Sequence, residues 1–201
     1  MQVEELVGRG HLTPVLAAWH HDEWGHLYSA DTWDMATAVR EFEAMADAGA
    51  VDRTWVAFDG DSREVDAVLG SVSLVASDDL DGFGHLTPWL ASMFVTPRAR
   101  GRGVGVALTD ALLAGARTDG HEVVHLFTTG QQQFWGDRGW SVVADVDAEG
   151  HPATVMVRTT RAGVELEQPN HTRPTMRGRT GRIARSLTTS EVRRMGRTPS
   201  L

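Results

Sequence analysis

Near the middle of the chain, the six residues Arg100-Gly101-Arg102-Gly103-Val104-Gly105 have the composition of a phosphate-binding turn. Glycine has no Cβ, so the backbone can approach a ligand closely, and successive backbone N–H groups can converge into an anion-binding nest. The helix expected to follow adds free amides and the positive end of its dipole. Because Arg98, Arg100 and Arg102 add positive charge around the turn, the sequence predicts a site for a pair of phosphates.

Two common phosphate motifs do not match this turn. A Walker loop requires Gly-Lys-Ser or Gly-Lys-Thr, and all 19 basic residues of this chain are Arg. A dinucleotide fingerprint requires Gly-x-Gly-x-x-Gly. Counted from Gly101, its last position is Val106, and counted from Gly103, it is Leu108. The pattern that remains is Arg-x-x-Gly-x-Gly, over residues 100–105, with a glycine turn that binds nothing as the alternative interpretation.

This pattern resembles motif A of the general N-acetyltransferase (GNAT) superfamily, which holds the pyrophosphate of acetyl-CoA. The segment 125–140 looks like the next strand and helix of that family. The segment 19–24 looks like the Trp-x-x-x-Glu-Trp helix of a bacterial subgroup of N-acetyltransferases, and the segment 88–92 is similar to that subgroup as well. The resemblance covers about residues 1–160, and the matching positions of the second segment are Phe134, Gly139 and Trp140.

The resemblance implies an α/β fold, more closely a mixed α+β sheet of about six to seven strands flanked by helices. It implies one acyl-CoA N-acyltransferase domain over residues 1–160, with acetyl-CoA as co-substrate. In the family, backbone groups of a central strand contact the pantetheine arm. The cofactor-binding residues expected from the resemblance and from the turn are Met93, Phe94, Val95, Arg98, Arg100, Gly101, Arg102, Gly103, Val104, Gly105, Phe134 and Trp135.

The chain departs from the family at the residue after Phe134. The family places there a Tyr that serves as general acid, and this chain has Trp135. An indole N–H can donate a hydrogen bond but cannot transfer a proton at ordinary pH. Tyr28, the one Tyr of the chain, is a candidate substitute, and an ordinary half-buried aromatic residue is the alternative interpretation.

Glu23 and His85 are the candidates for handling the amine. Glu23 follows Trp19 by four residues, so that both lie on one face of a helix. A carboxylate between the indoles of Trp19 and Trp24 is partly desolvated, which favours its acting as a base. His85 ends an acidic loop and could act as a base near neutral pH. A surface carboxylate and a loop histidine without a role are the alternatives.

The spacing of apolar, glycine and proline residues predicts the elements that position these groups. Pro97 is expected to end a strand buried on both faces, over 89–95, and Gly120 to cap the helix that follows the turn, over 105–118. The other expected strands are 3–6, 54–58, 67–75 and 122–127, with a final hairpin of 140–145 and 154–158. The other expected helices are 14–24, capped by Thr13, a second helix through 48 capped by Asp31 or Thr32, and 131–137.

The charge and the composition of the chain restrict its expected partners and its expected location in the cell. The chain has 201 residues, no Cys and a net charge of −8. Residues 168–201 carry eight Arg and one Glu, or +7, so the remainder carries −15. We expect residues 161–201 to form a disordered, solvated tail, and we expect no nucleic-acid partner unless the arginines of this tail supply the contact. No apolar run approaches the roughly 18 residues of a membrane span, so a cytoplasmic protein is expected.

The sequence thus predicts an N-acetyltransferase that moves the acetyl group of acetyl-CoA directly to a primary amine. The acceptor is expected to be a small molecule or a protein amino group. We expect no membrane partner, no metal, and a monomer or homodimer. A non-catalytic acyl-CoA-binding or sensing module is the alternative, favoured by Trp135.

Overall fold

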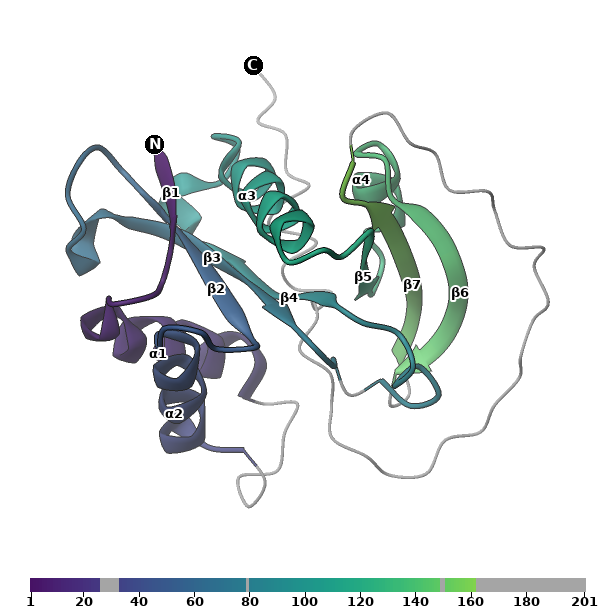
Figure 1. The fold of residues 1–201 in the computed structure, drawn as a ribbon, viewed down its shortest axis with the longest axis horizontal. Helices are drawn as coiled ribbons and strands as arrows, with labels where there is room; N and C mark the ends of the chain where they lie inside the picture. The colour runs from purple at the N-terminus through teal and green to yellow at the C-terminus, as the bar shows by residue number, and fades with distance from the viewer. Residues whose placement is uncertain (26–32, 79, 149–150, 162–201) are drawn as a thin grey trace. The chain divides into compact units, whose positions relative to one another are not determined.

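The computed structural model describes residues 1–25, 33–78, 80–148 and 151–161. Their contacts define two compact units. The first comprises Met1–Ala76 with Ser92–Leu112, and the second comprises Ser77–Ala91 with the described residues after Leu112. Strand β4 (Trp89–Val95) and helix α3 (Val104–Thr118) contribute residues to both units (Figure 1). The expected domain of residues 1–160 therefore contains two units, and the expected tail lies outside the described residues apart from Arg161.

Within these described residues, seven strands form one hydrogen-bonded sheet in the order β1-β2-β3-β4-β5-β7-β6. The pair β4 and β5 (Val123–Thr128) is parallel, with Trp89 opposite His125. The pairs β1–β2, β2–β3, β5–β7 and β6–β7 are antiparallel, so the sheet is mixed, as expected from the sequence. The remaining strands are β1 (Gln2–Glu5), β2 (Arg53–Phe58), β3 (Val68–Val75), β6 (Ser141–Ala148) and β7 (His151–Thr159).

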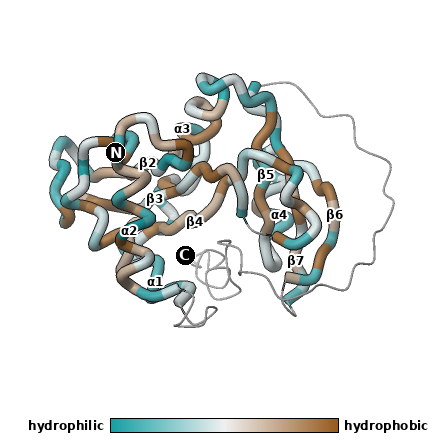
Figure 2. The backbone as a smooth tube through the Cα atoms, turned by 60° about the horizontal axis from the view of Figure 1, so that its bottom comes forward, coloured by the Kyte–Doolittle hydropathy of each residue, from teal (hydrophilic) through white to brown (hydrophobic). Residues whose placement is uncertain are grey.

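In the first unit, helices α1 (Thr13–Trp24) and α2 (Met35–Met45) pack against the strands with their apolar sides. Ala38, Phe42 and Met45 are the buried positions of α2. The hydroxyl of Thr54 on β2 donates a hydrogen bond to the sulfur of Met45 at 3.1 Å, which fixes α2 over this part of the sheet. The beginning of α3 lies on the opposite face of these strands (Figures 1 and 2).

The two predicted N-caps were wrong. Thr13 is the first residue of α1 instead of its cap, because its hydroxyl donates to the carbonyl of Gly10 in the preceding turn of 3₁₀-helix (Gly10–Leu12). Helix α2 is capped by Asp34, whose carboxylate accepts from the backbone N–H of Thr37 at 2.8 Å. The proposed caps Asp31 and Thr32 lie outside the described residues.

The elements around the phosphate turn agree closely with the expectation. Strand β4 spans Trp89–Val95 and all its residues are buried. Figure 2 shows the mostly hydrophobic residues of β4 and β5. Helix α3 ends at Thr118, and Gly120 follows in the left-handed conformation with φ of 88°. In the second unit, the short helix α4 spans Gln132–Gly136, within the predicted segment.

Candidate functional site

The turn between β4 and α3 requires glycine at two positions for conformational reasons. Gly101 and Gly103 have φ angles of 75° and 78°, in the region that side chains rarely adopt. A Cβ at either position would meet nothing within 4 Å, so the backbone conformation and not crowding selects glycine here. The turn leads directly into Val104, the first residue of α3, where the amides of a first helical turn have no partner within the helix.

The turn is packed against β4 through Gly105. A Cβ at Gly105 would lie 3.6 Å from the sulfur of Met93 and 3.9 Å from a methyl group of Val95. Met93 and Val95 are 1% and 4% exposed, and Val104 beside the glycine is also buried. The strand, the turn and the start of the helix therefore form one packed structure within the first unit.

The three arginines of the turn have different partners. The guanidinium of Arg98 donates to the carbonyl oxygens of Asp66 and Val68, just before and at the start of β3. Arg100 donates through Nε to the carbonyl of Val95 at 3.1 Å, so that it bonds back to the end of β4. Arg102 forms an exposed ion pair with Asp59, with 3.3 Å between nitrogen and oxygen.

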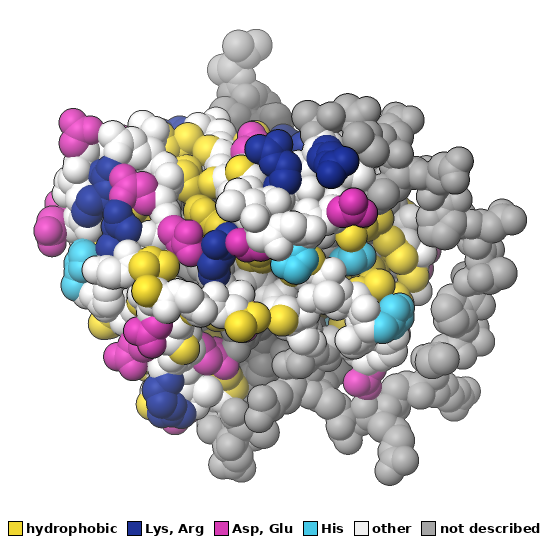
Figure 3. All heavy atoms as spheres, viewed as in Figure 1, with side chains coloured by type: hydrophobic (Ala, Val, Ile, Leu, Met, Phe, Trp, Pro, Cys, Tyr) yellow, Lys and Arg dark blue, Asp and Glu magenta, His cyan; other side chains and the backbone are white. Residues whose placement is uncertain are grey.

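On the face that Figure 3 draws, arginine side chains are interspersed with acidic ones. The positive charge available to an anion at the turn therefore comes from individual guanidinium groups, together with the backbone amides of the turn. The pair of Arg102 with Asp59 is exposed, with about half of each side chain accessible.

Strand β4 contains an irregularity at Ser92. Its φ is 57°, and it is the one described residue other than glycine with a positive φ. Ser92 is buried, and the conformation turns the peptide groups next to it out of the regular strand direction. Phe94 follows two residues later with 7% exposure. Strand β4 is therefore irregular just before Met93, Phe94 and Val95.

Helix α1 reaches β4 through an aromatic contact. The ring of Trp19 stacks on Phe94 with centroids 5.2 Å apart and an interplanar angle of 29°. Glu23 lies one helical turn after Trp19 and is half-buried. Trp24 turns instead to the interior, 3% exposed, with its ring 4.6 Å from His20. The stack brings the helix that carries Glu23 to the strand that carries Met93, Phe94 and Val95. Tyr28 lies outside the described residues.

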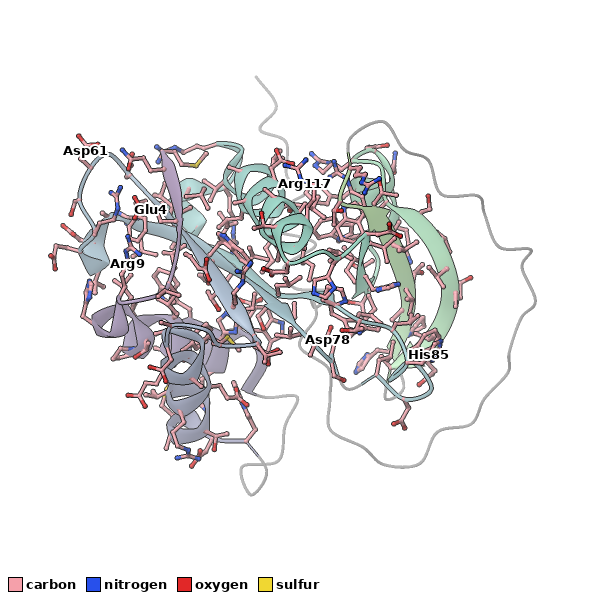
Figure 4. All side chains as sticks on the ribbon, viewed as in Figure 1. Glu4, Arg9, Asp61, Asp78, His85 and Arg117 are labelled. Atoms are coloured by element: carbon pink, nitrogen blue, oxygen red, sulfur yellow. The ribbon has the colours of Figure 1, made fainter. Side chains whose placement is uncertain are left out.

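In the second unit, His85 lies on the loop between β3 and β4, which also carries Asp78 (Figure 4). His85 is exposed, and its ring stacks on Phe83 at 6.3 Å. The charge of His85 affects the pKa of His125, a residue that the sequence analysis did not select. His125 on β5 is 7% exposed, and burial lowers the pKa of its imidazole, as does the nearby charge of His85. A hydrogen bond to the carbonyl of Pro88 opposes these effects.

The sequence held one signal for His125, a histidine within an apolar strand. Periodicity shows that such a residue is buried, but it does not show which loop or strand its ring faces. The pairing of His125 with Trp89 depends on the crossing from β4 to β5, 36 residues along the chain, and no local pattern encodes it.

Phe134 and Trp135 lie on α4. Trp135 is 1% exposed, and its ring makes edge contacts with Phe134 at 5.1 Å and with Trp140 at 5.4 Å. Within the described part of the chain its indole N–H has no hydrogen-bond partner. Phe134 is half-buried beneath the guanidinium of Arg138, which lies 3.7 Å from the ring centroid. These two residues therefore belong to a packed aromatic group of the second unit.

Among residues 1–25, 33–78, 80–148 and 151–161, no group of three His, Asp or Glu side chains is arranged to hold a metal ion. Each helix in these same ranges is too short or too polar to cross a membrane.

Comparison with solved structures gives a consistent fold. An aminoglycoside 6'-N-acetyltransferase complexed with coenzyme A has a TM-score of 0.61 and 16% identity, over 85% of this chain and 100% of that one. An aminoglycoside 6'-N-acetyltransferase from Enterococcus faecium has a TM-score of 0.55 and 16% identity, over 85% and 100%. The yncA protein of Salmonella typhimurium, solved with acetyl-CoA, has a TM-score of 0.59 and 19% identity, over 83% and 98%.

At the level of sequence, no curated protein matches the chain. The model of the acetyltransferase (GNAT) family matches residues 14–135. That range is more than half of the chain, and it contains β4, the glycine turn, α3, and all but one residue of each of α1 and α4. The chain therefore belongs to the GNAT family of acetyltransferases.

Proposed function

We propose that this enzyme transfers the acetyl group of acetyl-CoA directly to a primary amine. The observation that carries the proposal is the turn at Gly101 and Gly103, whose left-handed glycines precede the first turn of α3 and follow a buried strand. Backbone amides in this arrangement form a nest for an anion. The pyrophosphate of the cofactor is the ligand that the family membership suggests for it.

The three arginines have separate roles in this proposal. Arg102 is exposed and can exchange its carboxylate partner Asp59 for a phosphate group. Arg100 contributes charge while it holds the end of β4 through Val95. Arg98 holds the turn against β3 through its bonds to backbone carbonyls, and its charge adds to the local potential. Of the three, Arg102 would contribute most to binding.

The backbone of β4 would receive the pantetheine arm and the thioester. Ser92 interrupts the regular strand just before Met93, Phe94 and Val95. A peptide N–H released from the ladder at this point can donate to the oxyanion that forms when an amine attacks the thioester carbon. The stack of Trp19 on Phe94 would hold this segment of the strand in place.

Glu23 would recognise the acceptor amine as an ammonium group. It is half-buried on the helix that contacts β4, where reduced solvation strengthens an ion pair. Trp135 would contribute packing, because an indole cannot supply a proton. The coenzyme A thiol has a reference acidity near that of Cys, about 8.5. The thiolate can therefore leave without a general acid.

A non-catalytic acyl-CoA sensor is the second candidate. It is favoured by the buried Trp135 at the position where the family has its proton donor. The acceptor of the enzyme would be a small molecule or a protein amino group. Two of the similar structures named above are aminoglycoside 6'-N-acetyltransferases, so aminoglycosides belong in a first panel of acceptors, beside polyamines and peptides with free amino groups.

The proposal is tested by calorimetric titration of acetyl-CoA and by thiol release with the acceptor panel. Gly103→Glu should lower the affinity for acetyl-CoA at least about 100-fold, because it places bulk and negative charge at the pyrophosphate. Gly49→Glu is the matched control, since Gly49 has a φ of 81° and equally open surroundings. Both variants bear a similar backbone strain of about 1–2 kcal/mol.

The outcomes separate the two candidates. Loss of binding in Gly103→Glu alone, with thiol release by the wild type, supports the enzyme. Binding without thiol release from any acceptor supports the sensor. Equal affinities of the wild type and a folded Gly103→Glu variant would show that the turn is not the cofactor site.

A further inference from the structure

The arginine that contributes most to the proposed cofactor site already has an anionic partner in this chain. Asp59 directly follows β2, and Arg102 lies in the glycine turn, between Gly101 and Gly103. Their ion pair joins the loop after β2 to the turn before α3, and all of these residues belong to the first unit. Because a carboxylate is negatively charged, as a phosphate group is, Asp59 is an internal anion beside the turn.

The loop and the turn are held together without this ion pair. The backbone N–H of Asp59 donates to the carbonyl of Ala67 at 2.8 Å, which closes the hairpin of β2 and β3. On the other side of the hairpin, the carbonyls of Asp66 and Val68 accept hydrogen bonds from Arg98. None of these bonds uses the carboxylate of Asp59. The pair of Asp59 and Arg102 can therefore break by rotation of the two side chains alone.

The geometry of the pair is that of a weak ion pair. The two oxygens of Asp59 lie 3.5 and 3.3 Å from one guanidinium nitrogen, Nη2 of Arg102. Strong pairs of arginine and carboxylate are shorter, at about 2.7–2.9 Å, and use two nitrogens. About half of each side chain is exposed, and exposed pairs change an equilibrium constant by only about 1.5- to 5-fold. Such a pair biases Arg102 and still gives way to a pyrophosphate, which carries two negative charges.

An internal partner of this kind weakens any ligand that needs the same arginine. The apparent affinity falls with the fraction of molecules in which the binding group is free. After the exchange, the released carboxylate stays on its fixed loop, and its charge repels the phosphates of the ligand. Both effects act on phosphates and not on an acyl group. Acetyl-CoA and the product coenzyme A carry the same phosphates, so the affinities of both are lowered alike.

We propose that Asp59 is an internal competitor, which lowers the affinity of this enzyme for acetyl-CoA and for the product coenzyme A. The inference rests on the function proposed above, because it requires the phosphates of the cofactor to bind at the glycine turn. Asp59 takes no part in the chemical step and acts through Arg102. The repulsion of bound phosphates speeds the release of coenzyme A, and product release limits the turnover of many enzymes.

Calorimetric titration of the full chain tests the competitor. Asp59→Asn keeps the shape of the side chain and removes its charge, so it should bind acetyl-CoA and coenzyme A about 2- to 5-fold more tightly than the wild type. Asp61→Asn is the matched control. It removes the same charge from the same loop, at a carboxylate that accepts a hydrogen bond from Gln2 at 2.8 Å (Figure 4). Its affinities should differ from the wild type by less than about 1.5-fold, since charges in solvent are screened.

Two more measurements distinguish competition from a structural role of Asp59. In the Arg102→Ala background, Asp59→Asn should change the affinity for acetyl-CoA by less than about 1.5-fold, because the competitor has lost its target. Acetyl-pantetheine has the thioester arm and lacks the phosphates. Its kcat/KM in the thiol-release assay should be the same for the wild type and Asp59→Asn. A structural role would alter the use of both thioesters and would persist without Arg102.

The outcomes separate this inference from the proposed function. Binding of acetyl-CoA by the wild type, with an equal affinity in Asp59→Asn, would overturn the role of Asp59 and leave the proposed function intact. Equal gains in Asp59→Asn and Asp61→Asn would also overturn that role, because the gain would then come from the total charge. A wild type that does not bind acetyl-CoA would overturn the proposed function, and the inference with it.

Discussion

Residues of one type in one short segment can have different roles, and Arg98, Arg100 and Arg102 illustrate this. All three follow the same buried strand within seven positions. One bonds to β3, one bonds to the end of β4, and one is held only by an exposed carboxylate. The number of arginines in a motif therefore overstates the charge that a ligand can use.

Arg102→Ala should affect mainly the affinity for acetyl-CoA, whereas Arg98→Ala should affect mainly the stability of the fold. Arg102→Ala should weaken acetyl-CoA binding about 5- to 20-fold with little loss of stability, since an exposed ion pair is worth about 0.2–1 kcal/mol. Arg98→Ala should lower the free energy of unfolding by about 1 kcal/mol, because it removes donors to two backbone carbonyls. Calorimetry and urea unfolding measure the two effects. Equal losses of affinity in both variants would contradict this division.

At the scale of elements, the approach of β3 to β4 is controlled by Gly70. The N–H of Thr96 donates to the carbonyl of Leu69 at 2.9 Å. A Cβ at Gly70 would lie 2.4 Å from the carbonyl oxygen of Phe94 and 3.1 Å from the Cα of Val95. These are backbone atoms of the strand proposed to hold the pantetheine arm, so they cannot turn aside as a side chain does.

Gly70→Ala should therefore displace β4. We expect the free energy of unfolding to fall by about 1–3 kcal/mol, the usual cost of overpacking, and the affinity for acetyl-CoA to fall at least about 10-fold. Gly10→Ala is the control, because a Cβ there meets nothing within 4 Å and the backbone is not left-handed. Chemical unfolding and calorimetry test both variants. A Gly70→Ala protein with wild-type stability and affinity would show that the two strands separate freely.

The elements around the turn were predictable because their signals are local. The apolar run of β4, Pro97, the glycines and Gly120 each mark a boundary through their own sequence. The cap of α2 was wrong because several polar residues precede the helix, and only backbone geometry selects Asp34. The positive φ of Ser92 and the bonds of Arg98 depend on contacts with distant strands, and so does the environment of His125. The expected roles of Glu23, Phe134 and Trp135 stay predictions.

At the scale of the whole molecule, a buried neutral histidine links folding to pH. The unfolded chain binds a proton at His125 near the ordinary pKa of about 6.5, whereas burial lowers the pKa in the folded state. Between the two values the unfolded state binds more protons than the folded state. The contribution of His125 to stability is therefore complete above about pH 6.5 and is lost as the pH falls toward the folded pKa.

The unfolding temperature of the wild type should decrease as the pH is lowered from 7 to 5. The decrease should be smaller in His125→Asn. Each unit by which folding lowers the pKa corresponds to about 1.4 kcal/mol. Scanning calorimetry at several pH values measures the difference between the two proteins. Identical slopes would mean that the pKa of His125 is the same in the folded and unfolded chains.

The position of β6 at the end of the strand order has a consequence for the protein in concentrated solution. An edge strand offers unpaired backbone groups to any other strand, which is a common start of aggregation. β6 carries two exposed carboxylates, Asp145 and Asp147, with one residue between them. Two copies that paired along β6 would bring four negative charges together. The acidity of β6 thus protects the sheet at an edge that no further strand of the described residues covers.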